Sequence, residues 1–267
     1  MLACIFVQFQ DNSCMTMLTS QRKKAILDAL KRDGQVLATE LSVRFDVSED
    51  TVRRDLRELA AEGLLQRVHG GALPASPAVA PFAQREDMES PVKQRIARRA
   101  AAMIAPGQVV IIDGGTTSAH LVRSLPADLS ATVVTHSPSV AVALADHPSI
   151  EVVLIGGRLY KHSIVTVGAA AVEAVSHIHA DIYFMGVTGV HPKAGLSTGD
   201  FEEAYIKRAL AGRAAETVVL ASSAKLNAAS PYVIGDIGLA QTIIVEESAD
   251  SKLTDPIEKA GVTVLRA

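Results

Sequence analysis

The pattern of hydrophobic and polar positions changes once along this chain, near Gly107. Before that point, apolar residues recur three and four positions apart, which is the spacing of amphipathic helices. After it, short unbroken runs of valine and isoleucine alternate with helical segments, a pattern typical of buried parallel strands. The pattern predicts a small helical domain followed by a larger, open and mostly parallel α/β domain.

Three short helices are expected in the first part, over residues 20–32, 38–45 and 49–63. The third begins after Ser48, whose hydroxyl can accept a hydrogen bond from a free amide of the first turn. Val52, Leu56 and Leu59 then form one apolar stripe, and the arginines of this segment fall on its sides and back. A helix with one apolar face and arginine side chains on the other has the form of a DNA recognition helix. The same stripe also fits an ordinary amphipathic helix whose polar face is solvated.

The segment after the third helix decides between these two interpretations. Residues 64–69 alternate in the manner of a strand, and Gly70-Gly71 permits a hairpin turn. Such a β-wing would carry Arg67 and His69 to the phosphate backbone, whereas His69 taken singly is more often an ordinary surface residue. Helices and wing together predict a winged helix-turn-helix that binds double-stranded operator DNA. The residues expected to contact DNA are Ser48, Thr51, Arg53, Arg54, Arg57, Arg67 and His69.

Composition along the chain sets the expected limits of the domains. Residues 1–17 are expected to be a disordered leader, and residues 18–73 the winged helix-turn-helix. Residues 74–89 are typical of a linker because prolines recur there among alanine and serine. Residues 90–267 are expected to form the α/β domain.

Seven buried strands are expected in the α/β domain, at residues 109–112, 132–135, 152–155, 182–185, 217–221, 242–246 and 262–265. Helices are expected at residues 92–104, 118–124, 139–145, 169–177, 201–211 and 255–260. In open α/β sheets, ligands bind beyond the carboxyl ends of the strands, so the loops at those ends hold the candidate site.

The most informative of these loops is Asp113-Gly114-Gly115-Thr116-Thr117, which follows the first strand and opens a helix. Glycines let the backbone approach a ligand closely, and a helix start offers free amides and the positive end of the helix dipole. The two threonines add hydroxyl donors. The loop therefore has the features of a phosphate cradle, with a plain tight turn as the alternative.

Other strand ends add residues to this site, at His136, Gly156-Gly157, Gly186 and Lys225. Lys225 suits a phosphate or carboxylate as a point charge, although it could be a simple surface lysine. Residues 195–200 are expected to form a flexible loop, and Glu202, Glu203 and Lys207 to form i, i+4 ion pairs rather than a catalytic dyad. The residues expected to bind a small-molecule effector are Asp113, Gly114, Gly115, Thr116, Thr117, His136, Gly156, Gly157, Gly186 and Lys225.

Composition excludes several kinds of protein. A net charge of -3 places any nucleic-acid affinity in a local patch, and 4% aromatic residues argue against single-strand binding by stacking. Cysteine occurs only at Cys4 and Cys14, which favours a reducing cytoplasm, and no segment is apolar over a membrane-spanning length. The chain start lacks the basic region of a signal peptide, and translation could begin at Met1, Met15 or Met17. No metal-ligand spacing or nucleophile motif is present, so neither a metal nor a cofactor is expected.

These motifs resemble those of DeoR-family bacterial transcriptional regulators. The segments that carry the resemblance are Val47 to Leu56, Arg67 to Ala72, Asp113 to Thr117, Thr135 to Ser137, Ile155 to Gly157, Gly195 to Thr198, Glu203-Ala204 and Lys207-Arg208. The resemblance covers about residues 18–267 and implies a repressor of sugar or polyol catabolism genes, released from its operator by a phosphorylated sugar or sugar alcohol. It also implies a sensor fold similar to ribose-5-phosphate isomerase and glucosamine-6-phosphate deaminase. The chain departs from the family at Ser222-Ser223-Ala224-Lys225, where members often have Asp-Ser-Ser-Lys, and at His136, where Asn is frequent.

An enzyme with an appended DNA-binding segment is the alternative, because Asp113 and Asp200 could act as bases in a sugar-phosphate isomerase or deaminase. Such an isomerase would be expected to carry acidic residues after the fourth strand, where this chain reads Gly186-Val187-Thr188-Gly189-Val190. The regulator interpretation is therefore preferred. A regulator that reads two half-sites needs at least two DNA-binding heads, so a homodimer or homotetramer is expected.

Overall fold

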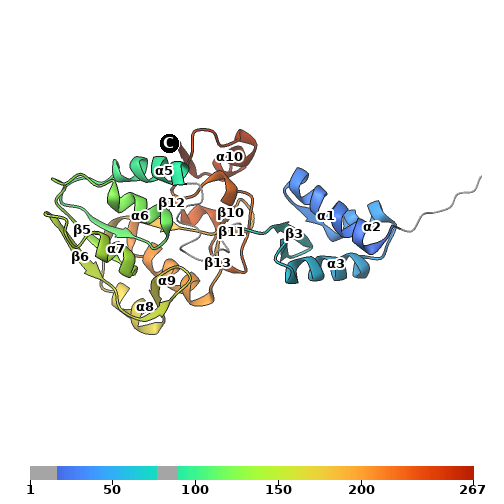
Figure 1. Cartoon of the computed structure of the whole chain (residues 1–267), viewed down its shortest axis with the longest axis horizontal. Coiled ribbons are helices and arrows are strands. Elements are labelled where there is room, and N and C mark those ends of the chain that lie inside the picture. The colour runs from blue at the N-terminus through green and yellow to red at the C-terminus, as the bar shows by residue number, and fades with distance from the viewer. Residues whose placement is uncertain (1–16, 77–89) are drawn as a thin grey trace, which may run out of the picture.

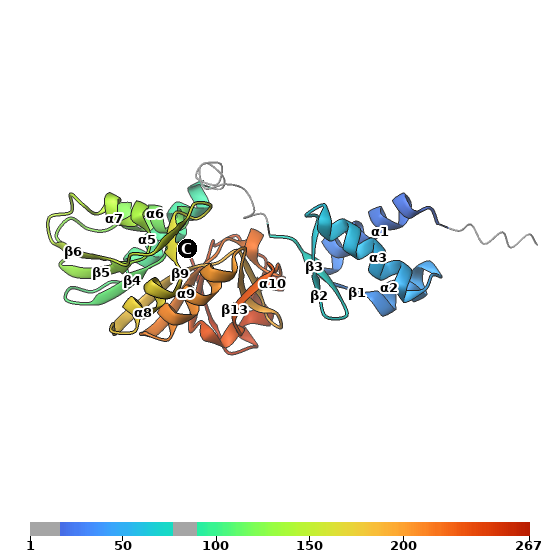
Figure 2. The same ribbon diagram turned by 90° about the horizontal axis from the view of Figure 1, so that it is seen from below.

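The computed structural model describes residues 17–76 and 90–267, which fold into two domains (Figures 1 and 2). The leader expected at residues 1–17 lies outside the described residues apart from Met17. The linker expected at residues 74–89 lies outside them apart from its first three residues. None of the helices in the described ranges is long and apolar enough to cross a membrane.

The first domain is a helix-turn-helix with a wing. Its elements are α1 (Thr19–Asp33), β1 (Val36–Leu37), α2 (Ala38–Phe45), α3 (Glu49–Ala61), β2 (Leu65–Val68) and β3 (Gly71–Pro74), and the three strands form an antiparallel sheet. The stripe expected on α3 is buried, since Val52, Leu56 and Leu59 are at most 2% exposed and share one core with Ile26 of α1 and Leu65 of β2. The predicted winged helix-turn-helix is confirmed.

An enclosed ion pair joins two helices of this domain. The guanidinium of Arg22 on α1 donates from Nε to Asp55 Oδ2 at 2.5 Å and from Nη2 to Asp55 Oδ1 at 3.1 Å. Both side chains are buried, so this bidentate contact fixes the position of α3 against α1.

The second domain contains a seven-stranded sheet of order β15-β14-β12-β9-β4-β5-β6, in which every neighbouring pair is parallel. The strands are β4 (Val109–Ile112), β5 (Ala131–Thr135), β6 (Ile150–Leu154), β9 (Ala180–Gly186), β12 (Ala214–Leu220), β14 (Thr242–Val245) and β15 (Thr263–Arg266). All seven expected strands are present within a few residues of their expected bounds, and the predicted parallel α/β architecture is confirmed.

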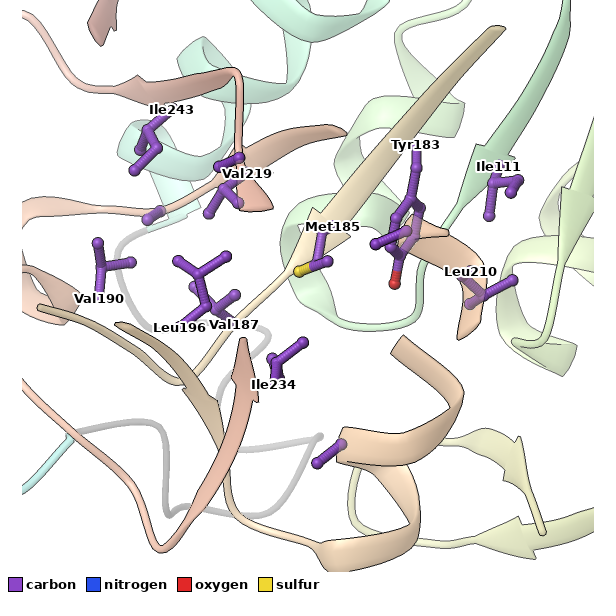
Figure 3. Packing of buried hydrophobic residues seen from close by; sticks show 14 of the residues in the cluster. Ile111, Tyr183, Met185, Val187, Val190, Leu196, Leu210, Val219, Ile234 and Ile243 are labelled. Atoms are coloured by element: carbon purple, nitrogen blue, oxygen red, sulfur yellow. The ribbon is translucent and has the colours of Figure 1, made fainter. Parts of the chain in front are cut away.

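Helices cover both faces of this sheet. One face, with Ile112 and Phe184, packs against α5 (Ser90–Ala101), α6 (Thr116–Arg123) and α7 (Pro138–Ala143). The other face packs against α8 (Ala169–Val175), α9 (Phe201–Ala211) and α10 (Ser251–Glu258). Figure 3 shows this second core, where Tyr183 of β9 lies near Ile111 of β4 and Leu210 of α9. Because successive strand residues point to opposite cores, the strands carry apolar residues without alternation.

Two antiparallel units were not expected from the sequence. One is the sheet of β10 (Gly189–His191), β11 (Gly195–Thr198) and β13 (Tyr232–Gly235), and the other is the pair β7 (Arg158–Tyr160) and β8 (Val165–Val167). The expectation of a flexible loop at residues 195–200 is wrong for its first four residues, because β11 is the buried middle strand of its sheet. Gly195 has a φ of +76° there, and a Cβ would lie 2.2 Å from the carbonyl oxygen of Gly235.

Candidate functional site

The start of α3 is the first candidate site. Ser48 Oγ accepts a hydrogen bond from Thr51 N at 3.2 Å and lies 2.9 Å from Thr51 Oγ1. Glu49 and Asp50 occupy the first turn, where the positive end of the helix dipole favours carboxylates. The cap therefore uses the side chains of Ser48 and Thr51 to fix the beginning of the helix.

A groove between α3 and the wing brings three of the expected DNA contacts together. Arg53 of α3 lines it with Arg67 and His69 of the wing. His69 and Gly70 form the tip of the hairpin, where Gly70 has a φ of +78°. Side chains from two elements thus lie on one surface. A protein that contacts both the bases in a DNA groove and the phosphates beside it needs such a surface.

The remaining expected contacts on α3 lie outside the lining of this groove. Arg54 and Arg57 are exposed on the helix. Arg53 is also exposed, and its Nη2 lies 2.7 Å from Glu49 Oε2. An exposed pair of this kind is weak, so the Arg53 guanidinium can exchange its partner for a base or a phosphate.

The second candidate site is a cleft at the carboxyl ends of β4 and β9. Asp113 follows β4, is fully buried, and holds several residues of the cleft in place. Its Oδ1 accepts hydrogen bonds from Gly114 N at 2.7 Å and from His136 Nε2 at 2.6 Å. Its Oδ2 accepts from Gly186 N at 2.8 Å and from Lys207 Nζ. Asp113 is therefore a structural centre from which the cleft is built.

Lys207 of α9 extends this network to the cleft surface. Its Nζ donates to Asp113 and to the carbonyl oxygen of Gly186 at 3.0 Å, and it lies 3.5 Å from Glu203 Oε1. Glu203 Oε2 in turn accepts from Thr198 Oγ1 of β11. Lys207, Glu203 and Thr198 all line the cleft, so a buried chain of polar contacts connects β11, α9 and β4.

The ionisation of this network follows from its contacts. Burial by itself raises the pKa of Asp113, but Lys207 and His136 outweigh it and hold that pKa below its ordinary value of 3.8. Burial by itself lowers the pKa of Lys207, but the charges of Asp113 and Glu203 outweigh it and raise that pKa above 10.5. Burial, and then the charge of Asp113, raise the pKa of the Tyr183 hydroxyl on β9. Asp113 and Lys207 are therefore both charged at neutral pH.

The start of α6 lines the same cleft with backbone amides. Gly115 is the N-cap, has a φ of +115°, and leaves the first turn without a capping side chain. Gly114 has no room for a side chain, because a Cβ would lie 2.2 Å from Val165 Cγ1. Thr116 and Thr117 line the cleft, and so does Lys225 of the short helix η2 (Ser223–Lys225). Amides, hydroxyls and a cation are the groups that hold a phosphate.

Some of the expected effector contacts lie outside the cleft lining. His136 is fully buried behind Asp113, and its Nδ1 donates to the carbonyl oxygen of Thr166 at 2.9 Å. Gly156 and Gly157 lie at the approach to β7. The cleft itself brings together six of the expected residues, namely Gly114, Gly115, Thr116, Thr117, Gly186 and Lys225.

The other residues that line the cleft were not among the expected effector contacts, and they are Ser118, Ser163, Val187, Thr188, Thr198, Glu203, Lys207 and Leu220. The expected i, i+4 pair of Glu203 and Lys207 exists, but it is buried and faces the ligand cleft. Asp200, a candidate base in the enzyme interpretation, caps α9 by accepting a hydrogen bond from Glu203 N at 2.9 Å. Within the described ranges, no group of three His, Cys, Asp or Glu side chains is arranged to hold a metal ion.

Both domains match the models of one protein family. Residues 22–77 match the DeoR-like helix-turn-helix domain, and residues 89–247 match the DeoR C terminal sensor domain. The regulator GlpR of Haloferax volcanii is 33% identical over 93% of this chain and 98% of its own length. The glycerol-3-phosphate regulon repressor of Escherichia coli K12 is 30% identical over 86% of this chain and 92% of its own length.

A solved structure of ribose 5-phosphate isomerase A from Methanocaldococcus jannaschii covers 51% of this chain and 54% of its own, with 19% identity and a TM-score of 0.38. A similarity this weak supports no inference about function. The named sequence relatives are regulators, which favours the regulator over the enzyme interpretation. With family models that match both domains in order, this chain belongs to the DeoR family of DNA-binding transcriptional regulators.

Proposed function

We propose that this regulator is a repressor of sugar or polyol catabolism genes and that a phosphorylated sugar or sugar alcohol, bound in the sensor cleft, releases it from its operator. One observation carries the proposal: the uncapped start of α6 and the ammonium of Lys225 line the same cleft. Both present positive potential, which suits a phosphate. Named relatives include a glycerol-3-phosphate regulon repressor, which supports an effector of this class.

The rest of the cleft suits the polyol part of such a ligand. Thr198, Glu203 and Lys207 offer a buried row of donors and acceptors beyond the α6 amides. Hydroxyl groups of a sugar can both donate and accept, so they satisfy such a row where an apolar group could not. Phosphate at one end and hydroxyls at the other together define the ligand class.

We propose that α3 enters the major groove of operator DNA with Arg53, Arg54 and Arg57, next to the capped turn of Ser48 and Thr51. Arginine pairs bidentately with guanine, and Arg67 and His69 of the wing would contact the flanking phosphates. Binding to two half-sites requires two such DNA-binding domains. The working form is therefore at least a homodimer, with a homotetramer as the larger alternative. The protein would act in the compartment that holds the chromosome, which is the cytoplasm in a bacterium.

The effector is tested by a thermal-shift screen against sugar and polyol phosphates, with the unphosphorylated compounds alongside. A ligand at about a hundred times its Kd adds about 2.7 kcal/mol of stability, which raises the melting temperature measurably. The shift should require the phosphate and should vanish in Lys225→Ala and Thr116→Ala, while Lys252→Ala, at an exposed lysine of α10, should keep it. Shifts that ignore the phosphate, or persist in both cleft variants, would refute the proposed ligand.

The DNA surface is tested by fluorescence anisotropy with an operator selected by the protein from a random library. Arg53→Ala should weaken operator binding by about 5- to 150-fold, which corresponds to about 1–3 kcal/mol for one bidentate base contact. The thermal shift with the effector should stay intact in this variant. Arg158→Ala, at an exposed arginine of the sensor domain, is the matched control. Equal affinities for wild type and Arg53→Ala would remove Arg53 from the base contacts.

A further inference from the structure

The segment after β12 touches both the effector cleft and the DNA-binding domain. Lys225 lines the cleft, and two residues later Asn227 lies directly against Gly34, the C-cap of α1. Two residues after that, Ala229 forms a parallel β-bridge with Ala75, the residue that follows β3. Within five residues the chain thus passes from Lys225, a proposed phosphate contact, to one contact with the DNA-binding domain at Gly34 and another at Ala75, directly after the last strand of that domain.

The side chain of Asn227 packs directly on the backbone of Gly34. A Cβ on Gly34 would lie 1.9 Å from Asn227 Nδ2, so a larger residue there would displace this amide. Gly34 has a φ of +72° and Asn227 a φ of +55°, a conformation that glycine and asparagine tolerate best. Two residues with positive φ are therefore in contact where the domains touch.

A second route joins the cleft to the same place. Thr188 lines the cleft, and its carbonyl oxygen accepts a hydrogen bond from Ser76 Oγ, just beyond the bridge at Ala75. The hydroxyl of Thr188 lies 2.7 Å from Ser230 Oγ, and Ser230 N donates to Ser197 Oγ at 2.9 Å. Movement of the cleft wall at Thr188 would therefore displace both Ser76 and the end of the 225–230 segment.

A crevice of mostly apolar lining lies between the domains beside these contacts. Its walls come from Leu27, Leu30 and Leu64 on one side and from Leu226 and Leu253 on the other. Among the described residues, the contacts at Gly34, Ala75 and Ser76 are therefore points at which a small displacement can change the orientation of the DNA-binding domain.

We propose that these contacts, which we call the junction (residues 225–230 with Gly34, Ala75, Ser76 and Thr188), transmit effector occupancy of the cleft to the orientation of the DNA-binding domain. The inference rests on the proposed function, because it takes an anion at Lys225 as the trigger. An anion that draws Lys225 inward shifts η2, and with it Asn227 and Ala229. The effector thereby favours one orientation of the DNA-binding domain over another, which is coupling by differential binding.

The test is hydrogen exchange of the full chain, with and without inorganic phosphate and the best compound of the thermal-shift screen. In wild type, ligand should slow exchange at residues 113–118 and change it at residues 222–230, 30–37 and 74–76. The double variant Ser76→Ala/Asn227→Gly removes two junction contacts, and glycine keeps the positive φ at 227. It should retain the change at 113–118 and lose the change at 30–37. Ser149→Ala, at an exposed serine far along the sheet, should behave as wild type.

Operator release gives the second readout of the same variants. Ligand should weaken operator binding at least tenfold in wild type and in Ser149→Ala, and less than twofold in the double variant. The proposal for the junction would be refuted if ligand still changed hydrogen exchange at residues 30–37 in the double variant, or if ligand still released that variant fully from its operator.

The failure of the proposed function looks different, because no ligand would then alter exchange at residues 113–118 in any variant. A ligand-free comparison tests the junction even in that case. The double variant should exchange faster than wild type at residues 34–37 and 74–76, and equal rates would overturn the junction as a contact.

Discussion

Each domain of this regulator buries an ion pair between an acidic residue and a basic one, and the two pairs serve different ends. In the DNA-binding domain, Arg22 and Asp55 meet in a bidentate contact between two helices. In the sensor domain, Asp113 and Lys207 meet at the end of a strand, and Lys207 also lines a cleft. The first pair holds two helices together. The second belongs to a hydrogen-bonded network that reaches the wall of the cleft.

The difference teaches that burial and charge do not by themselves mark a site. Arg22 and Asp55 pair with each other, and Arg22 also contacts the carbonyl oxygen of Met17 at 3.4 Å, so this pair does not lead to a cleft. Asp113 instead binds Lys207, His136 and two backbone amides, and the network continues through Glu203 to the cleft wall. A buried pair becomes part of a site when its contacts branch toward a cleft.

The largest effect is expected from Asp113→Asn. The change removes the carboxylate that Lys207 and His136 both contact, which should lower the sensor domain's free energy of unfolding by about 3–5 kcal/mol and abolish the thermal shift with phosphates. Urea unfolding followed by circular dichroism measures the loss. Asp181→Asn is the control, since Asp181 also accepts a backbone hydrogen bond, from Val109 N at 2.8 Å, but at an exposed position. A loss at Asp113 no larger than at Asp181 would contradict the role of the network.

The pair in the DNA-binding domain should behave as a replaceable contact. Asp55→Ala leaves Arg22 buried and unpaired, which should cost about 3 kcal/mol, whereas Arg22→Met/Asp55→Leu should cost less than about 1 kcal/mol because it removes both charges. Calorimetry of the full chain, with the phosphate thermal shift as a second readout, checks this. The effector response should persist in the double variant, and its loss would mean that this pair, too, belongs to the signalling machinery.

The sensor pair also predicts a window of pH. The pKa of Asp113 is held below 3.8, so its stabilising contribution is full above about pH 3.8 and is lost as the pH falls toward the folded-state pKa. The pKa of Lys207 is raised above 10.5, so its contribution is full below about pH 10.5 and is lost at higher pH. The urea concentration at the unfolding midpoint of the sensor domain should therefore decrease below about pH 3.8 and above about pH 10.5. In Asp113→Asn the acid limb should flatten, and an unaltered acid limb would assign it to other carboxylates.

The smallest effect is expected from an exposed pair. Glu49→Gln removes the nearer of the two carboxylates that pair with Arg53, and the free energy of unfolding should change by no more than about 0.5 kcal/mol. Operator affinity should rise by about two- to fivefold, because a carboxylate no longer competes with DNA phosphate for the guanidinium. Fluorescence anisotropy at fixed salt measures this gain. A fall in affinity would instead indicate that Glu49 orients Arg53 for its base contact.

Most of the architecture could be predicted from the sequence, because the main sheet is buried on both faces. That burial leaves unbroken apolar runs such as Val109–Ile112, which are easily recognised and lie where they were expected. The strand β11 could not be recognised in the same way. Its residues Gly195, Ser197 and Thr198 are typical of a loop, and only pairing with β10 and β13 makes them a buried strand.

The candidate site was predictable where it follows the main strands and not where it depends on contacts between distant residues. Asp113 and the glycines after it were expected because parallel strands end together. Glu203 and Lys207 have the spacing of an ordinary exposed helical pair, and their burial depends on Asp113, which is 94 positions away from Lys207. His136 stands at a strand end like a ligand contact, yet its ring turns inward to Asp113.

The order of the sheet has a consequence for synthesis of the protein. β4 is made first but lies between β5 and β9, and Ile111 of β4 pairs with Tyr183 of β9, so the centre of the sheet forms only after a long stretch of chain has been translated. The helix-turn-helix has its own core and needs none of those strands. We therefore expect a nascent chain to carry a folded DNA-binding domain well before its sensor exists. A message cut short within the sheet would yield a folded helix-turn-helix without the cleft that is proposed to control it.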